Sequence, residues 1–138
     1  MVKQEWEIAQ DEFEAAFNKG KFSYCHRFPD SLDATRGNYN NPRSRFVKLP
    51  PQPSDFIVVW NGITFFAEVK STKSTTGISS SLFKNQAAQK LKILNAGGIY
   101  YFFVKRISTG QWYRLPGNYP NLNAKWSELD KFLFDIQK

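Results

Sequence analysis

Asp55, Glu68 and Lys70 are the residues of this sequence whose types and spacing suggest chemistry. They lie at the two ends of an apolar stretch, "DFIVVWNGITFFAEVK", that has an Asn-Gly pair at its middle. Asn-Gly between β-branched and aromatic residues predicts a two-residue hairpin turn, because both residues accept a positive φ. Counting outward from this turn places Asp55 directly opposite Glu68, and alternation returns Lys70 to the same face. Two carboxylates that a lysine or a metal ion would compensate form an active-site pattern.

The neighbours of the two carboxylates are apolar on both faces of the predicted hairpin. Like charges directly opposite one another, roughly 4.5–5.5 Å apart at Cβ, destabilise a sheet unless something compensates them. Two apolar faces predict a central strand pair that is covered on both sides. The alternative for each residue alone is structural: Glu68 and Lys70 as a surface ion pair, and Asp55 as the end of a loop. The combination of all three on one face favours function.

The surrounding pattern predicts an α/β protein with a mixed central sheet. Apolar residues at three- and four-residue spacing predict a helix over 4–19, which ends at a glycine. The other predicted elements are a strand over 21–28, the hairpin over 55–70, a helix over 85–95, strands over 99–105 and 111–115, and a final helix. That final helix is predicted to begin near Ser127, with Asp130 three residues on, and to carry Leu129, Phe132, Leu133 and Ile136.

A long segment, about 29–54, separates the first strand from the hairpin. It is rich in proline and carries Arg36, Arg43 and Arg45. A connection of this length in a compact domain is uncommon unless it is functional, so we expect it to project from the domain as a basic loop.

Composition bounds the classes of protein. A chain of 138 residues with 41% hydrophobic residues predicts a single domain. A net charge of +7 indicates a polyanionic partner, nucleic acid before membrane. We expect no membrane association and a cytoplasmic protein, because the chain has no long apolar run and starts with a charged segment. A single cysteine, Cys25, excludes an internal disulfide, and with the single histidine, His26, it cannot complete a zinc site.

A strand-end aspartate followed by Glu-x-Lys on the next strand resembles the PD-(D/E)xK nuclease superfamily, and most of all RecU-type Holliday junction resolvases. The residues that carry the resemblance are "QPSDF", "AEVKSTKS" and "LFKNQ" leading to "AGGIYYF", and it extends over about residues 5–115. Ser54 departs from the pattern, because it separates the motif proline from Asp55. The resemblance implies a restriction-endonuclease-like αβββαβ core, with a mixed central sheet flanked by helices, in a single nuclease domain over 1–138.

The resemblance also implies an activity. The protein would be a metal-dependent, structure-selective DNA endonuclease of recombination and repair that resolves Holliday junctions. Mg²⁺, or Mn²⁺, would be held by Asp55, Glu68 and the backbone carbonyl of Val69, and Lys70 would orient the water or steady the scissile phosphate. Two symmetric cuts imply a homodimer on branched or duplex DNA. The alternatives are a nuclease of the same superfamily on restriction-type, fork or flap DNA, and a DNA-binding module that has lost catalysis.

Further site residues follow from the same resemblance. The family places a glutamate of the first helix near the metal, for which Glu7 is the first candidate and Glu12 the second. It places a glutamine of the second helix near the scissile phosphate, where Gln86 is favoured over Gln89. The residues expected to bind DNA are Arg36, Arg43, Arg45, Lys73 and Lys84. A solvated basic face that only aids solubility is the alternative for these charges.

Overall fold

The computed structural model describes residues 2–29, 52–83, 87–119 and 123–134 of the chain. Their order is α1 (Glu5–Asn18), β1 (Ser23–Arg27), β2 (Phe56–Trp60), β3 (Ile63–Thr72), β4 (Gly77–Ile78), the 3₁₀ turn η2 (Ser80–Phe83), α3 (Ala87–Asn95), β5 (Tyr100–Arg106), β6 (Gln111–Pro116), β7 (Ala124–Lys125), the 3₁₀ turn η3 (Trp126–Glu128) and β8 (Lys131–Phe132).

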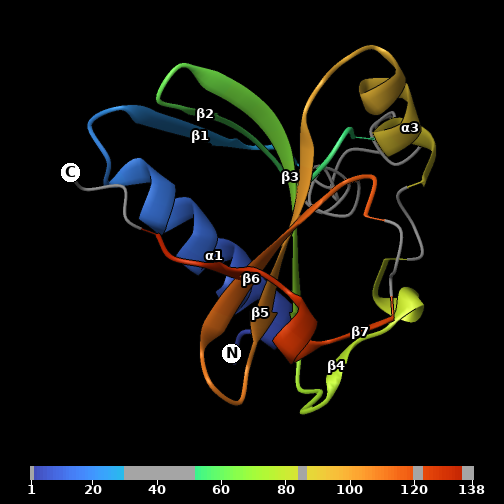
Figure 1. Cartoon of the computed structure of the whole chain (residues 1–138). Coiled ribbons are helices and arrows are strands. Elements are labelled where there is room, and N and C mark those ends of the chain that lie inside the picture. The colour runs from blue at the N-terminus through green and yellow to red at the C-terminus, as the bar shows by residue number, and fades with distance from the viewer. Residues whose placement is uncertain (1, 30–51, 84–86, 120–122, 135–138) are drawn as a thin grey trace, which may run out of the picture.

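One six-stranded mixed sheet organises these elements. Its strand order is β1-β2-β3-β5-β6-β8, and only β3 and β5 are parallel. Parallel neighbours need a crossover, and the chain between β3 and β5 supplies it through α3. The helices α1 and α3 lie on opposite sides of the sheet (Figure 1). The predicted α/β class with a mixed central sheet is confirmed: α1, β1, β2, β3, α3 and β5 follow one another in the expected αβββαβ order.

The hairpin between β2 and β3 forms as predicted. Asn61 and Gly62 have φ values of 51° and 82°, the positive values of a type I′ turn. The register runs from Trp60 opposite Ile63 to Phe56 opposite Ala67. Asp55 is therefore one residue beyond the last pair, on the strand position that faces Glu68.

Gly62→Val should destabilise the protein by roughly 1–2 kcal/mol, because a residue with a β-carbon is strained in the left-handed region. No atom lies within 4 Å of a Cβ built at Gly62, so the cost comes from the backbone alone. Gly62→Asn is the control, since asparagine tolerates positive φ. Urea unfolding would measure both variants. Equal stability of Gly62→Val and the wild type would contradict the strained turn.

The face of the sheet that carries α1 is an aromatic core. Ala9, Phe13 and Phe17 of α1 are fully buried against it. The Phe13 ring lies 4.9 Å from the ring centroid of Phe103 and 5.0 Å from that of Phe56. Helical spacing on one side and strand alternation on the other thus build a core that fixes α1 across β2, β3 and β5.

The opposite face, which carries Glu68, is only partly covered. Tyr100, Phe102 and Val104 of β5 are buried there with residues of η2, α3 and β6. Over β2, however, Ile57 and Val59 are only half-buried. The prediction that the hairpin is covered on both sides is wrong at this end, because the described covering elements pack over β5 and not over β2.

The predicted final helix is wrong. The side chain of Glu128 accepts a hydrogen bond from the backbone N–H of Lys125 at 2.9 Å and so caps a single 3₁₀ turn. The N–H of Leu129 closes this turn on the Trp126 carbonyl at 3.2 Å, and Leu129 itself has an extended backbone. Phe132 is buried and Leu133 is exposed, so the segment follows strand alternation and pairs with β6 as β8. Ile136, the last residue assigned to this helix, lies outside the described residues.

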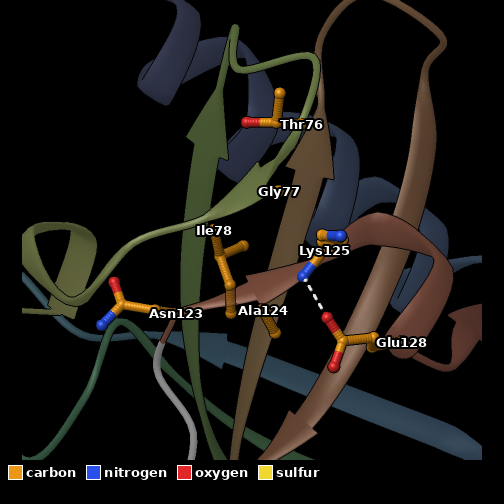
Figure 2. Close-up of a pocket in the computed structure, with 7 residues that line it drawn as sticks. All are labelled: Thr76, Gly77, Ile78, Asn123, Ala124, Lys125 and Glu128. Atoms are coloured by element: carbon orange, nitrogen blue, oxygen red, sulfur yellow. Dashed lines mark hydrogen bonds between the residues drawn. The ribbon is translucent and has the colours of Figure 1, made fainter.

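The short strands β4 and β7 form a second, two-stranded sheet that the polar sequence after β3 did not predict. Beside it lies a recess of about 320 Å³ (Figure 2). Its lining residues are Thr76, Gly77, Ile78, Asn123, Ala124, Lys125 and Glu128. None of the residues predicted to act in catalysis lines this recess, so the candidate site lies elsewhere.

Candidate active site

The candidate site lies at a step in the sheet where β2 begins and β3 continues. Beyond Ala67, β3 is paired with β5 alone among the described strands. Asp55 occupies the vacated edge: its carbonyl accepts a hydrogen bond from Phe28 N at 2.9 Å, and its Oδ2 accepts one from Val69 N at 2.9 Å. The aspartate side chain therefore takes the place that a continued β2 backbone would have taken.

Ser54, the departure from the family pattern, has a structural role in this arrangement. It is buried, and its hydroxyl donates a hydrogen bond to the carbonyl of Phe56 at 2.6 Å. This contact fixes the chain on both sides of Asp55 and so helps to direct the carboxylate toward β3. The insertion between Pro53 and Asp55 is compatible with the site.

Glu68 is the most buried charged side chain of the site, at 2% exposure. It shares its face of β3 with Lys70, whose Nζ lies 3.9 Å from Glu68 Oε2. That distance allows an ion pair but exceeds a direct hydrogen bond. The predicted group of Asp55, Glu68 and Lys70 is therefore brought together by the fold.

Burial raises the pKa of the Asp55 carboxyl, despite opposing contributions from its neighbours. The Val69 N–H, the bond with Glu68 and the positive charges of Lys70 and Arg27 all act to lower that pKa. Burial therefore favours the protonated form of Asp55 when no cation is bound. A bound cation would replace that proton, which is the behaviour expected of a metal site.

The donor set fits Mg²⁺ or Mn²⁺. These ions take oxygen ligands, and Mg²⁺ keeps several waters, so two carboxylates and one carbonyl suffice. Because the N–H of Val69 faces Asp55, strand geometry turns the Val69 carbonyl to the same edge. No cluster of three or more His, Cys, Asp or Glu side chains occurs in the described ranges, so a closed four-ligand zinc site is not formed there.

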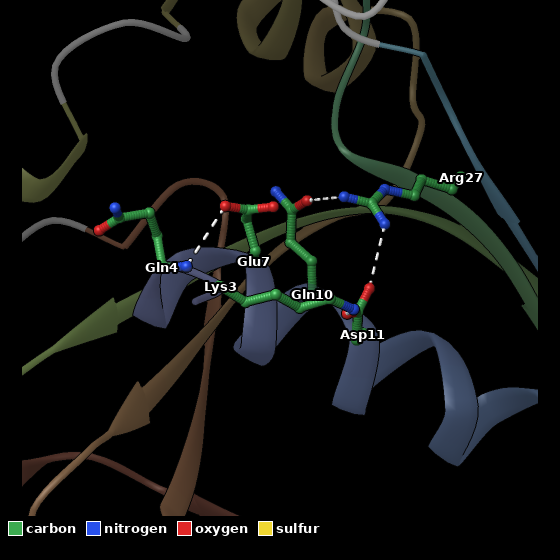
Figure 3. Close-up of polar contacts among 6 residues, drawn as sticks. All are labelled: Lys3, Gln4, Glu7, Gln10, Asp11 and Arg27. Atoms are coloured by element: carbon green, nitrogen blue, oxygen red, sulfur yellow. Dashed lines mark hydrogen bonds and ion pairs between the residues drawn. The ribbon is translucent and has the colours of Figure 1, made fainter. Parts of the chain in front are cut away.

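The first-helix glutamates have other partners in the structure. Glu7 accepts a hydrogen bond from the backbone N–H of Gln4 at 3.3 Å and so caps α1 (Figure 3). Glu12 accepts one from Lys105 Nζ at 2.7 Å. Neither contact involves Asp55 or Glu68. The role of Glu7 in catalysis stays a prediction, and Glu12 has a structural partner on β5.

Arg27 is a neighbour of the site that the sequence did not reveal. Its guanidinium donates to Gln10 Oε1 at 2.5 Å and pairs with Asp11 Oδ1 at 3.3 Å, which ties β1 to α1 (Figure 3). Its charge also lowers the pKa of Asp55. Arg27 comes near Asp55 because β1 pairs with β2 and places Arg27 opposite Phe56, the residue that follows Asp55. That pairing joins segments on either side of the long 29–54 segment, so local pattern carries no signal for it.

The helix α3 packs on the face of the sheet that carries Glu68, opposite to α1, and brings the cation Lys90 to that face. Lys90 Nζ lies 5.2 Å from the ring centroid of Phe102, and Phe102 is the register partner of Glu68. Gln89, the second candidate for the helix glutamine, is half-buried on α3, and Lys73 is exposed beyond β3. The remaining predicted residues lie outside the described residues: Arg36, Arg43, Arg45, Lys84 and Gln86.

No helix in the described part of the chain is long and apolar enough to cross a membrane.

Comparison with known proteins gives a distant likeness to solved structures. No model of a protein family matches the chain. No curated protein sequence matches it either. Among solved structures, the chain is similar to Hjc, a Holliday junction resolvase from the archaeal hyperthermophile Archaeoglobus fulgidus, with 16% identity and a TM-score of 0.48. The match covers 94% of this chain and 87% of Hjc.

Proposed function

We propose that the protein is a metal-dependent, structure-selective DNA endonuclease that resolves Holliday junctions, and that the whole chain is one nuclease domain. The observation that carries the proposal is the pairing of the half-buried Asp55 with the buried Glu68, with Lys70 on the same face. Buried carboxylates without a cation are costly, and a fold that keeps two of them at a strand end gains by binding one.

Asp55, Glu68 and the Val69 carbonyl would hold Mg²⁺, with Mn²⁺ as a substitute. A bound divalent ion supplies an acidified water and neutralises the charge that develops on the phosphate. Lys70, as a point charge 3.9 Å from Glu68, would hold the attacking water or a phosphate oxygen. Val69 N–H keeps Asp55 in position through its hydrogen bond.

DNA is the substrate that the charge of the chain favours. A net charge of +7 attracts a polyanion, and contacts to phosphate give affinity without sequence information. A four-way junction needs two symmetric cuts, which a homodimer would deliver. The alternatives are the same chemistry on restriction-type, fork or flap DNA, and binding without cleavage.

Incubation with a four-way junction, a linear duplex and a flap, each with Mg²⁺ or with EDTA, distinguishes these functions. We expect paired nicks in the junction that require the metal. Equal cleavage of all three substrates would assign a less selective nuclease. Binding without metal-dependent cleavage of any of them would assign a DNA-binding module.

The basic segment provides a test of substrate choice. Arg36, Arg43 and Arg45, which lie outside the described residues, are expected to contact phosphates near the branch point. Replacing all three with alanine should weaken junction binding more than duplex binding. It should also reduce the slope of log K against log salt by about 0.9 for each phosphate that an arginine no longer neutralises. Filter binding across a salt series measures both effects.

The control for this triple variant removes the same charge elsewhere. Lys19, Lys125 and Lys131 are exposed, and their replacement with alanine should leave the ratio of junction to duplex affinity unchanged. An equal loss on both substrates in the arginine variant would exclude a role in branch recognition and favour the alternative of a generic nuclease.

A further inference from the structure

Tyr100 is a buried polar residue next to the two carboxylates that the proposed mechanism does not use. It opens β5 and is 1% exposed. Its register partner on β3 is Phe66, and Glu68 is the partner of Phe102. Tyr100, Phe66 and Phe102 all belong to the hydrophobic cluster on the face of Glu68. Neighbouring strands lie roughly 4.7–4.9 Å apart and each residue adds about 3.3 Å along a strand, so a residue two positions further along the adjacent strand is within reach of an aromatic side chain.

The surrounding chain holds the Tyr100 ring in one place. The Phe102 ring packs edge-on against it with centroids 5.5 Å apart. Gly117 closes the other side: its N–H donates to the Tyr100 carbonyl at 2.6 Å, and a Cβ built at Gly117 would lie 3.0 Å from Tyr100 Cβ. Only a residue without a side chain fits so close to this ring, so the direction of the hydroxyl is set by packing.

The hydroxyl of Tyr100 lies on the face of the sheet that carries Glu68. Burial raises the pKa of Tyr100 above its ordinary value, and the charges of Glu68 and Asp55 and the interaction of the hydroxyl with Glu68 raise it further. A phenol hydroxyl carries one hydrogen that it can donate to a carboxylate. The hydroxyl oxygen is buried, and among the described residues it has no partner at normal hydrogen-bond geometry. A buried hydroxyl without a hydrogen bond destabilises the fold, so a hydrogen bond from Tyr100 to the nearby Glu68 carboxylate would remove this cost.

We propose that Tyr100 is a positioning residue that donates its hydroxyl hydrogen to the Glu68 carboxylate and orients that carboxylate toward a divalent cation. The inference rests on the proposed function, because it requires Glu68 to be a metal ligand. Partners that orient metal-binding carboxylates typically contribute about 10–100-fold to metal affinity or activity. Tyr100 would thus do for Glu68 what Val69 N–H does for Asp55.

Tyr100→Phe tests the inference, because it removes the hydroxyl and keeps the ring. We expect its affinity for Mn²⁺, measured by calorimetry without DNA, to fall about 10–100-fold. Junction cleavage should fall at low Mn²⁺ and recover at saturating Mn²⁺. The melting temperature in EDTA should not fall, since the ring packing against Phe102 and Gly117 is retained.

Tyr113→Phe is the matched control. Tyr113 is buried in the same cluster at 3% exposure, and its ring stacks on Trp126 with centroids 4.8 Å apart. This variant should bind Mn²⁺ as the wild type does. Equal loss of Mn²⁺ affinity in both variants, or a lower melting temperature that accompanies the loss in Tyr100→Phe, would overturn the positioning role.

Two further outcomes separate this inference from the proposed function. If Asp55→Asn loses Mn²⁺ binding while Tyr100→Phe binds Mn²⁺ like the wild type, the role of Tyr100 is overturned and the proposed function stands. If the wild type binds no Mn²⁺ and cleaves no DNA in its presence, both are overturned.

Discussion

Asp55→Asn should lower the rate of junction cleavage about 1,000-fold or more while DNA binding persists or tightens. An amide is a poor ligand for a hard divalent ion, and metal-ion catalysis supplies several kcal/mol of transition-state stabilisation. A loss of about 4 kcal/mol corresponds to about 1,000-fold in rate. Removing one negative charge beside Glu68 also lowers the repulsion of phosphate, which favours binding. Single-turnover cleavage and filter binding on the same junction measure the two effects.

The same variant should change the pH dependence of stability in metal-free protein. Burial raises the pKa of Asp55 above its ordinary value of 3.8, so the folded state keeps a proton that the unfolded chain has released. The free energy of unfolding of the wild type should therefore fall as pH rises from about 3.8 through the raised pKa. Asp55→Asn carries no such charge, so its stability should fall less over this range and exceed that of the wild type at neutral pH.

Asp55→Ala separates the charge from the hydrogen bond. The amide oxygen of the asparagine variant can still accept from Val69 N–H, whereas alanine leaves that donor without its partner. We expect Asp55→Ala to be inactive and less stable than Asp55→Asn, as thermal unfolding in EDTA would show. Wild-type cleavage by either variant would contradict the assignment of Asp55 as a ligand.

Lys70→Ala should lower the cleavage rate about 100–1,000-fold with little change in folding stability. Losing one group that stabilises developing charge typically has this effect on kcat. Stability should change little, because the Lys70 side chain is 21% exposed and its Nζ lies 3.9 Å from Glu68 Oε2, so the pair is not a tight, fully buried ion pair. Lys70 also acts to lower the pKa of Asp55, so its removal should move the acid limb of the rate profile to higher pH.

Lys73→Ala is the control for Lys70. Lys73 is exposed just beyond β3, and its removal should leave the acid limb in place and lower affinity for DNA more than turnover. Lys70→Arg should recover little activity, because a planar guanidinium does not replace a compact point charge. Unchanged turnover in Lys70→Ala would reduce Lys70 to a surface charge.

The part of the site that the sequence predicts is the part that local chemistry determines. Asn61 and Gly62 fix a turn, the turn fixes a register, and the register brings Asp55, Glu68 and Lys70 to one face. Each step requires only near neighbours in the chain. Strong periodicity likewise predicts α1 and the two long strands after α3.

The parts that the sequence does not predict depend on distant partners. The segment after Ser127 has apolar spacing that suits a helix, but Lys131 and Phe132 instead pair with the edge of β6 as a short strand. Arg27 reaches the site only because β1 pairs with β2 across a long connection. Tyr100 lies beside Glu68 only because β5 pairs with β3 in parallel through a crossover. Tertiary pairing outweighs local preference in all three cases.

Single-turnover cleavage of a four-way junction by Asp55→Asn, Glu68→Gln and the double variant tests most directly whether the two carboxylates form one metal site. Residues that act as a unit are strongly non-additive. We predict that each single variant loses nearly all Mg²⁺-dependent cleavage and that the double variant is no slower than either one. Near wild-type cleavage by either single variant, or losses that multiply in the double variant, would contradict a shared site at Asp55 and Glu68.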